Sequence, residues 1–230
     1  CWKPPFSSAP TADGPGTRAV IAGHWQDPAV QEKIALWQRA AVGAMFSHSL
    51  KIVRFGDNMR EVAVTEGDKI EAQLRMGWQV NTWAVGDLVA EMNQVTEAEI
   101  DQLMEEYAAL YDFDAADTET IRYQAREEIA MERILVAVGA KAFTNTFEDL
   151  HGMRQLPGLA TQHLMAKGYG YGGEGDWKTA GMTAILKAMY PDGATSFMED
   201  YTYDYSKELI LGAHMLEVCP SITATKPKIE

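Results

Sequence analysis

The glycine-dense stretch at residues 170–175 carries one carboxylate, Glu174, and a second, Asp176, follows it directly. Loops this rich in glycine often hold phosphate, and the glycine spacing matches part of the P-loop pattern. Two carboxylates beside the loop would repel a phosphate, and Lys178 and Thr179 come two residues too late for that pattern. A divalent cation is therefore the expected guest of this loop.

Two further side chains could join such a site: Glu199 in the segment SFMEDY and His214 in the segment LGAHMLE. Together with Glu174 they offer two carboxylates and one imidazole. Oxygen and nitrogen ligands of this kind suit Mn²⁺, Co²⁺ or Mg²⁺, with positions left for the oxygens of a substrate. These three residues form the candidate site.

Each candidate also has a purely structural interpretation. Asp176 could be the N-cap of the helix that follows it, and Glu174 could be a solvated loop acid. Glu199 could be a charge on an edge strand, and His214 a hydrogen-bonded core histidine. The spacings of 25 and 15 residues between Glu174, Glu199 and His214 are not a motif by themselves.

The elements that must position these residues follow from periodicity and from turn signals. We predict strands at residues 19–23, 50–57, 79–85 and 142–147, and helices at 28–46, 68–77, 96–112, 117–140, 156–168 and 176–190. Alternating strands and helices predict an α/β fold, a parallel sheet with helices on both faces in a Rossmann-like three-layer domain. After residue 193, two strand-like runs without an intervening helix begin a mostly β substructure.

Composition narrows the class of protein. The chain has 230 residues, 47% of them hydrophobic, as expected for a packed globular protein. A formal charge of −13 argues against nucleic acid and anionic membranes as partners. The sequence shows neither a spanning apolar stretch nor a secretory signal, and its two cysteines make no disulfide framework. We therefore expect a soluble, cytoplasmic protein.

Several long sequence words point to one family. They are GHWQD (23–27), RFGDNMREVAVTEGDK (54–69), VNTWAVGDLV (80–89), TFEDLHG (146–152), GEGDWKTA (173–180), TSFMEDYTY (195–203) and HMLEVCPSI (214–222). Through these words the chain resembles the bacterial L-arabinose isomerases over residues 19–223. The resemblance implies three parts: an irregular arm and the remnant of an N-terminal α/β domain (1–50), a central α/β domain (51–192) and the beginning of a C-terminal β-rich domain (193–230).

The resemblance also implies an activity and a set of site residues. The family members are intramolecular oxidoreductases of arabinose catabolism, which convert L-arabinose to L-ribulose and D-galactose to D-tagatose through an enediolate. They use Mn²⁺, and they assemble as hexamers or tetramers, so a sugar substrate and a homo-oligomer are the expected partners. The residues implied are Glu174 and Glu199 as catalytic acid and base, Glu174, Glu199 and His214 as metal ligands, and Met59, Phe147 and Asp176 as substrate-binding residues.

The chain departs from the family in two places. The fourth metal ligand of the family is a histidine well beyond the position of His214, and these 230 residues are expected to lack it, as they lack the family's upstream Asn-Gln-x-x-His-Gly segment. Two alternatives therefore stand beside L-arabinose isomerisation. The chain could be a truncated, non-catalytic part of such an isomerase, or it could act on a related sugar such as L-fucose.

Overall fold

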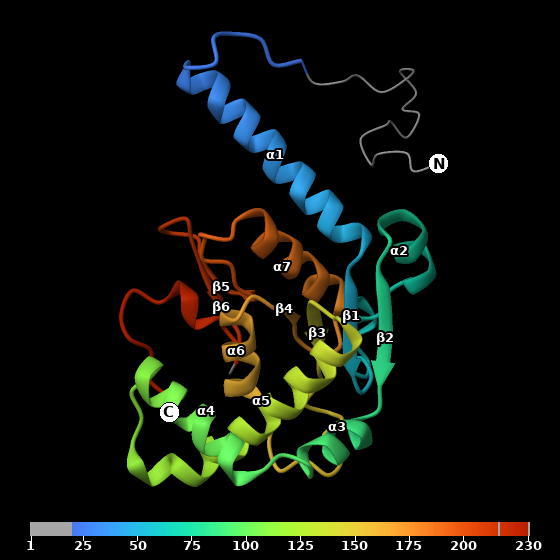
Figure 1. Ribbon diagram of the computed structural model, residues 1–230, viewed down its shortest axis with the longest axis vertical. Coiled ribbons are helices and arrows are strands. Elements are labelled where there is room, and N and C mark those ends of the chain that lie inside the picture. The colour runs from blue at the N-terminus through green and yellow to red at the C-terminus, as the bar shows by residue number, and fades with distance from the viewer. Residues whose placement is uncertain (1–19, 216, 230) are drawn as a thin grey trace.

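The computed structural model describes residues 20–215 and 217–229, which form a four-stranded sheet, a two-stranded sheet and surrounding helices (Figure 1). The strands are β1 (Lys51–Phe55), β2 (Gln79–Trp83), β3 (Ala142–Thr144), β4 (Gly170–Gly172), β5 (Glu199–Asp204) and β6 (Leu209–Ala213). The α-helices are α1 (Pro28–His48), α2 (Lys69–Met76), α3 (Val85–Met92), α4 (Glu97–Leu110), α5 (Thr118–Val138), α6 (Gly158–Ala166) and α7 (Trp177–Met189). Short 3-10 helices lie at Ala63–Thr65, Ala115–Asp117 and Pro220–Ile222.

The larger sheet has the strand order β2-β1-β3-β4, and its three pairings are all parallel. Parallel neighbouring strands need crossover connections. Helix α2 lies between β1 and β2, helices α3 to α5 lie between β2 and β3, and α6 lies between β3 and β4. The carboxyl ends of the four strands therefore lie along one edge of the sheet. Loops that follow β1, β3 and β4 meet at this edge.

Both faces of the sheet are covered. Ile52 of β1 and Ala142 of β3 belong to a buried cluster with Trp177 of α7. Their neighbours Val53 and Phe143 point to the other face and join the larger core, to which α3, α4, α5 and α6 contribute. This alternation along each strand gives three layers, so the predicted α/β fold with a helix-covered parallel sheet is confirmed.

Local signals set the helix ends as predicted. Thr96 and Glu99 form a reciprocal capping box at the start of α4. Gly77 and Gly139 end α2 and α5 in the left-handed conformation, with φ of 78° and 70°. Asp27 caps α1, and its side chain accepts a hydrogen bond from the backbone of Ala29.

Helix α1 extends away from the rest of the molecule (Figure 1). It contacts α7 at Gly43, where an added Cβ would lie only 2.6 Å from the sulfur of Met189. The apolar spacing that predicts this helix does not correspond to a buried face, because Ile34 and Trp37 are 39% and 50% exposed. Leu36 and Met45 are exposed as well, so much of the apolar surface of α1 has no cover among the described residues.

The predicted elements and the described ones differ in a few places. The arm at residues 1–18 lies outside the described residues. The strand predicted at 19–23 is wrong, because Val20 to Gly23 form no strand and Val20 is largely exposed without a pairing partner in the described part of the chain. Conversely, sequence patterns did not indicate α3, whose N-cap Ala84 makes no side-chain hydrogen bond, or the three-residue strand β4.

Strands β5 and β6 form an antiparallel hairpin, as the two strand-like runs after residue 193 predict. Most hairpin residues are exposed, including Tyr201, Tyr203 and Leu211. Its register pairs Glu199 with Ala213. None of the helices in the described ranges has both the length and the apolar character that crossing a membrane requires.

Candidate functional site

Glu174 lies in the loop between β4 and α7, at the carboxyl edge of the sheet. Its φ is +62°, which is unusual for a residue with a side chain, and Gly175 follows with a φ of +84°. The carbonyl of Glu174 accepts a hydrogen bond from the backbone of Met59 at 2.9 Å, and Gly175 donates one to the carbonyl of Asn145 at 2.9 Å. These bonds join the loops after β1, β3 and β4.

The glycines of β4 have a packing role. A Cβ on Gly170 would lie 2.3 Å from the carbonyl oxygen of Ala180, and one on Gly172 would lie 2.5 Å from that of Asp176. Both oxygens belong to the backbone of α7 or its N-cap, which cannot move aside cheaply. The glycine-dense sequence thus reflects the close approach of α7 to β4 as well as the turn at Glu174.

Asp176 is the N-cap of α7, as its structural interpretation predicts. Its carboxylate accepts hydrogen bonds from the backbone of Lys178 at 3.0 Å and of Thr179 at 3.1 Å. It also accepts one from the Thr179 hydroxyl at 2.9 Å and lies 3.2 Å from the Lys178 ammonium. These contacts hold the carboxylate at the start of the helix.

The hairpin brings Glu199 and His214 to the same end. Glu199 is the first residue of β5, and His214 follows the last residue of β6, Ala213, with which Glu199 is paired. His214 Nε2 lies 4.0 Å from Glu199 Oε1. The imidazole ring also packs edge-on against Phe197, with ring centroids 4.8 Å apart.

Glu174, Glu199 and His214 surround one cavity of about 150 Å³. Of the substrate-binding residues that the family resemblance implies, Phe147 lines this cavity, whereas Met59 and Asp176 are not part of its lining. The lining consists of Asn145, Thr146, Phe147, Leu156, Glu174, Glu199, Tyr201, His214, Met215 and Glu217. Three distant segments of the sequence therefore converge at the carboxyl edge of the sheet.

The ionisable groups around the cavity influence one another electrostatically. Burial and the negative charge of Glu199 raise the pKa of Glu174, and the nearby His214 partly opposes this rise. The contact with Glu217 raises the pKa of His214, and the charges of Glu199 and Glu174 add to this effect. The site is thus an acidic cluster that favours a bound proton or a cation.

Glu217 is the site residue that sequence reasoning missed. Its side chain is 3% exposed, and Oε2 lies 2.8 Å from His214 Nδ1. Its other oxygen, Oε1, accepts a hydrogen bond from the hydroxyl of Tyr171 in β4. The available signal was a carboxylate between apolar residues three positions after a candidate ligand, in HMLEVC.

The donor set suits a hard divalent cation in its chemistry, with carboxylate oxygens and an imidazole nitrogen around one cavity. In the described ranges, however, no three His, Cys, Asp or Glu side chains are placed so that they could hold an ion as they stand. An ion at this site would therefore have to draw the side chains of Glu174, Glu199 and His214 together.

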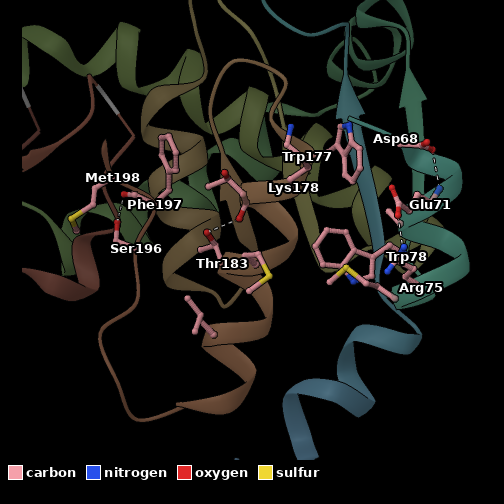
Figure 2. A pocket seen from close by; sticks show the side chains of 15 residues that line it. Asp68, Glu71, Arg75, Trp78, Trp177, Lys178, Thr183, Ser196, Phe197 and Met198 are labelled. Carbon is pink, nitrogen blue, oxygen red and sulfur yellow. Dashed lines mark hydrogen bonds and ion pairs between the residues drawn. The ribbon is translucent and has the colours of Figure 1, made fainter. Parts of the chain in front are cut away.

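A larger groove of about 640 Å³ lies between α2, α7 and residues 196–198 (Figure 2). Its lining is mainly apolar, and its acidic side chains are engaged locally. Asp68 accepts a hydrogen bond from the Glu71 backbone at 2.8 Å, and the Glu71 carboxylate pairs with Arg75 at 2.7 Å. Phe197 lines this groove and also contacts His214, so it forms part of the wall between the two hollows.

Two family models match this chain. A family model described as L-arabinose isomerase central domain matches residues 51–192, and one described as L-arabinose isomerase C-terminal domain matches residues 194–230. The chain is 57% identical to an L-arabinose isomerase of Anoxybacillus flavithermus over 221 residues, which cover 93% of this chain and 44% of that protein.

Other relatives give the same result. An L-arabinose isomerase of Geobacillus thermodenitrificans is 55% identical over 93% of this chain and 45% of its own, and one of Clostridium beijerinckii is 56% identical over 93% and 44%. The chain thus spans less than half of the length of the curated relatives it matches. Because a family model matches more than half of its residues, the chain belongs to the L-arabinose isomerase family.

Proposed function

We propose that this chain carries the catalytic glutamates of an aldose–ketose isomerase that converts L-arabinose to L-ribulose and also D-galactose to D-tagatose. The convergence of Glu174, Glu199 and His214 on one cavity, in a member of this family, supports the proposal. The reaction is an intramolecular oxidoreduction, in which C1 of the sugar is reduced and C2 is oxidised.

The two glutamates divide the proton transfers. One carboxylate removes the proton from C2, and the electron pair of that bond forms the C1–C2 double bond of an enediolate while O1 gains charge or a proton. The proton is then returned to C1, and the hydroxyl proton on O2 leaves as the new carbonyl forms. Glu174, after β4 at the sheet edge, and Glu199, on the hairpin, line the same cavity, which supports the assignment of an acid and a base that act on one substrate.

The cofactor belongs to the same proposal. Glu174, Glu199 and His214 would hold a divalent cation, Mn²⁺ first and Co²⁺ or Mg²⁺ as alternatives. When bound, such a cation supplies Lewis-acid polarisation of the sugar carbonyl. The acidic character of the cluster supports this assignment, because burial and the negative charge of Glu199 both raise the pKa of Glu174.

The three substrate-binding residues receive different roles. Phe147 is 49% exposed and lines the cavity, so its ring contacts the substrate directly. Met59 acts through its backbone hydrogen bond to the Glu174 carbonyl, and Asp176 through the start of α7. Both therefore support the loop that carries Glu174.

We further propose a cytoplasmic homo-oligomer, a hexamer or tetramer as in the family. The apolar side chains exposed on α1, among them Leu36, Trp37 and Met45, support an interface between copies. Size-exclusion chromatography with light scattering tests the assembly. A strictly monomeric chain at micromolar concentration would contradict it.

The activity is tested by ketose formation from L-arabinose with the purified 230-residue chain, with and without Mn²⁺. Activity that depends on Mn²⁺ and is lost in Glu174→Gln and Glu199→Gln supports the proposal. Full activity in both variants overturns the assigned roles. Measurable Mn²⁺ binding without ketose formation would instead favour a non-catalytic part of an isomerase. This is the second candidate, because the chain covers less than half of the relatives' length. Comparison with L-fucose as substrate separates the third alternative.

A further inference from the structure

Glu217 connects the cavity to the core of the molecule. Its Oε2 lies 2.8 Å from His214 Nδ1, and its Oε1 accepts a hydrogen bond from the hydroxyl of Tyr171. Tyr171 belongs to β4 and is fully buried. A carboxylate that is itself 3% exposed thus lies between a strand of the sheet and the imidazole of the candidate site.

The single hydroxyl proton of Tyr171 can be donated to only one of two neighbouring oxygens. Its hydroxyl oxygen lies 2.7 Å from Asn145 Oδ1 as well as against Glu217, but a phenol has one proton to give. The ionised acceptor forms the stronger bond, so the proton goes to Glu217. The Asn145 amide can turn its NH₂ to the phenol oxygen and present its carbonyl to the Thr161 hydroxyl, which lies beside it.

The phenol of Tyr171 holds its proton more strongly than a free phenol does. Burial and the charge of Glu217 raise the pKa of Tyr171 well above its usual value. Tyr171 is therefore a permanent donor, and it anchors Glu217 in a fixed position behind the histidine.

The position of Glu217 determines what His214 can present to the cavity. A carboxylate oxygen 2.8 Å from Nδ1 favours a proton on that nitrogen, because two lone pairs would otherwise face each other, and this leaves the lone pair of the neutral ring on Nε2. Nε2 is the atom that lies 4.0 Å from Glu199 Oε1. Phe197 packs edge-on against the same ring and restricts its rotation.

We propose that Glu217, anchored by Tyr171, is the positioning residue that fixes His214 as the Nδ1-protonated tautomer with Nε2 turned toward Glu199. The use of Nε2 as a metal ligand rests on the proposed function, whereas the tautomer is a property of the metal-free chain. A carboxylate behind a ligating imidazole also raises its basicity, and loss of such a partner typically weakens metal binding about 10- to 100-fold.

The test reads the tautomer directly. The chain is labelled with ¹⁵N-histidine, and the two ring nitrogens of His214 are identified by long-range ¹H–¹⁵N correlation without metal. Because the neighbouring carboxylates raise the pKa of His214, the pH is increased until the ¹⁵N shifts show a neutral ring. The resonances are assigned by their loss in His214→Gln. We expect a protonated Nδ1 in the unmodified chain.

Two variants and one control complete the experiment. Glu217→Leu removes the acceptor and should move the ring proton toward Nε2 and raise the Kd for Mn²⁺ about 10-fold or more. Tyr171→Phe releases the anchor and should give a mixture of tautomers with a smaller rise in Kd. Glu148→Leu removes a carboxylate that is bound by Arg60 instead, and it should leave the tautomer unchanged.

Each outcome decides between the proposals. A proton on Nε2 in the unmodified chain overturns the positioning role, even if Glu217→Leu does not fold. So does an unchanged tautomer in a folded Glu217→Leu or Tyr171→Phe variant. A protonated Nδ1 that depends on Glu217, in a chain that binds no Mn²⁺ and forms no ketose, supports the positioning role and contradicts the proposed metal-dependent function.

Discussion

The backbone amide of Met59 donates a hydrogen bond to the carbonyl of Glu174 at 2.9 Å, which ties the loop after β1 to the loop after β4. The next residue, Gly175, approaches the first loop so closely that a Cβ would lie 2.3 Å from the Cα of Asn58. The Glu174 backbone can therefore hold this position only because residue 175 is glycine, which has no side chain to meet Asn58.

Gly175→Ala should displace the loop that carries Glu174. At a φ of +84° alanine is strained, and its methyl group would meet the backbone of Asn58, so we expect a loss of about 1–3 kcal/mol in the free energy of unfolding. Gly139→Ala is the matched control, since Gly139 has a φ of +70° but no atom within 4 Å of an added Cβ. Urea unfolding of both variants separates the steric clash with Asn58 from the backbone strain that both positions share. Equal losses of unfolding free energy in the two variants would contradict the clash.

Gly172→Ala should separate β4 from α7. The new methyl group would lie 2.5 Å from the carbonyl oxygen of Asp176 and 2.7 Å from the amide of Ala180, both backbone atoms, so overpacking should cost about 1–3 kcal/mol. Gly86→Ala in α3 meets open space and should instead stabilise the protein by about 0.5–1 kcal/mol. Thermal denaturation of both variants checks the opposite signs, and a stabilised Gly172→Ala would refute the packing role.

Glu127→Gln should change the pH dependence of stability. Burial raises the pKa of Glu127 to about 9, so the folded state keeps this proton above pH 4.5 while the unfolded state releases it. Its contribution to stability is complete below about pH 4.5 and declines as the pH rises toward 9, by about 1.4 kcal/mol per pH unit. Glutamine keeps the shape and the acceptor for Gln124 but cannot ionise.

The measurement is urea unfolding from pH 5 to pH 8. We expect the stability of Glu127→Gln to fall less steeply with pH than that of the unmodified chain. Glu119→Gln removes an exposed carboxylate from the same helix and serves as the control. A slope in Glu127→Gln that matches the slope in the control would contradict the buried neutral carboxyl.

Removal and return of Mn²⁺ should shift the melting temperature through the proposed site. An ion that binds only the folded chain stabilises it by about 2.7 kcal/mol at 100 times its Kd. We expect this shift in the chain freed of metal by a chelator and its loss in Glu174→Gln, which removes one proposed ligand. Differential scanning fluorimetry across a Mn²⁺ titration provides the readout. An equal shift in Glu174→Gln would place the ion elsewhere.

Much of the fold could be predicted because its signals are local. The capping box of Thr96 and Glu99 and the glycines that end α2 and α5 act within one helical turn, so sequence alone locates these ends. The alternation of Ile52 and Val53 between two cores likewise follows from strand geometry.

The remainder depends on contacts that are distant in sequence. Strand β4 is Gly-Tyr-Gly, and it is a strand because β3 pairs with it and α7 covers it. Glu217 acquires its role from Tyr171, 46 residues earlier, and no local pattern reports that contact. Asp176 shows the converse, because its role as the N-cap of α7 could be predicted locally, whereas its absence from the cavity lining could not.

The register of the hairpin has a consequence for the choice of ion. Glu199 begins β5 and pairs with Ala213, the residue before His214, so the hairpin pairing sets the spacing between Glu199 and His214, whereas Glu174 belongs to the sheet edge. A shift of β5 and β6 as one body against the sheet widens or narrows the gap to Glu174 and leaves the other spacing intact. If the proposed ion binds at this site, discrimination between ions of different radius would depend on how firmly residues 193–198 and 217–219 hold the hairpin against the sheet.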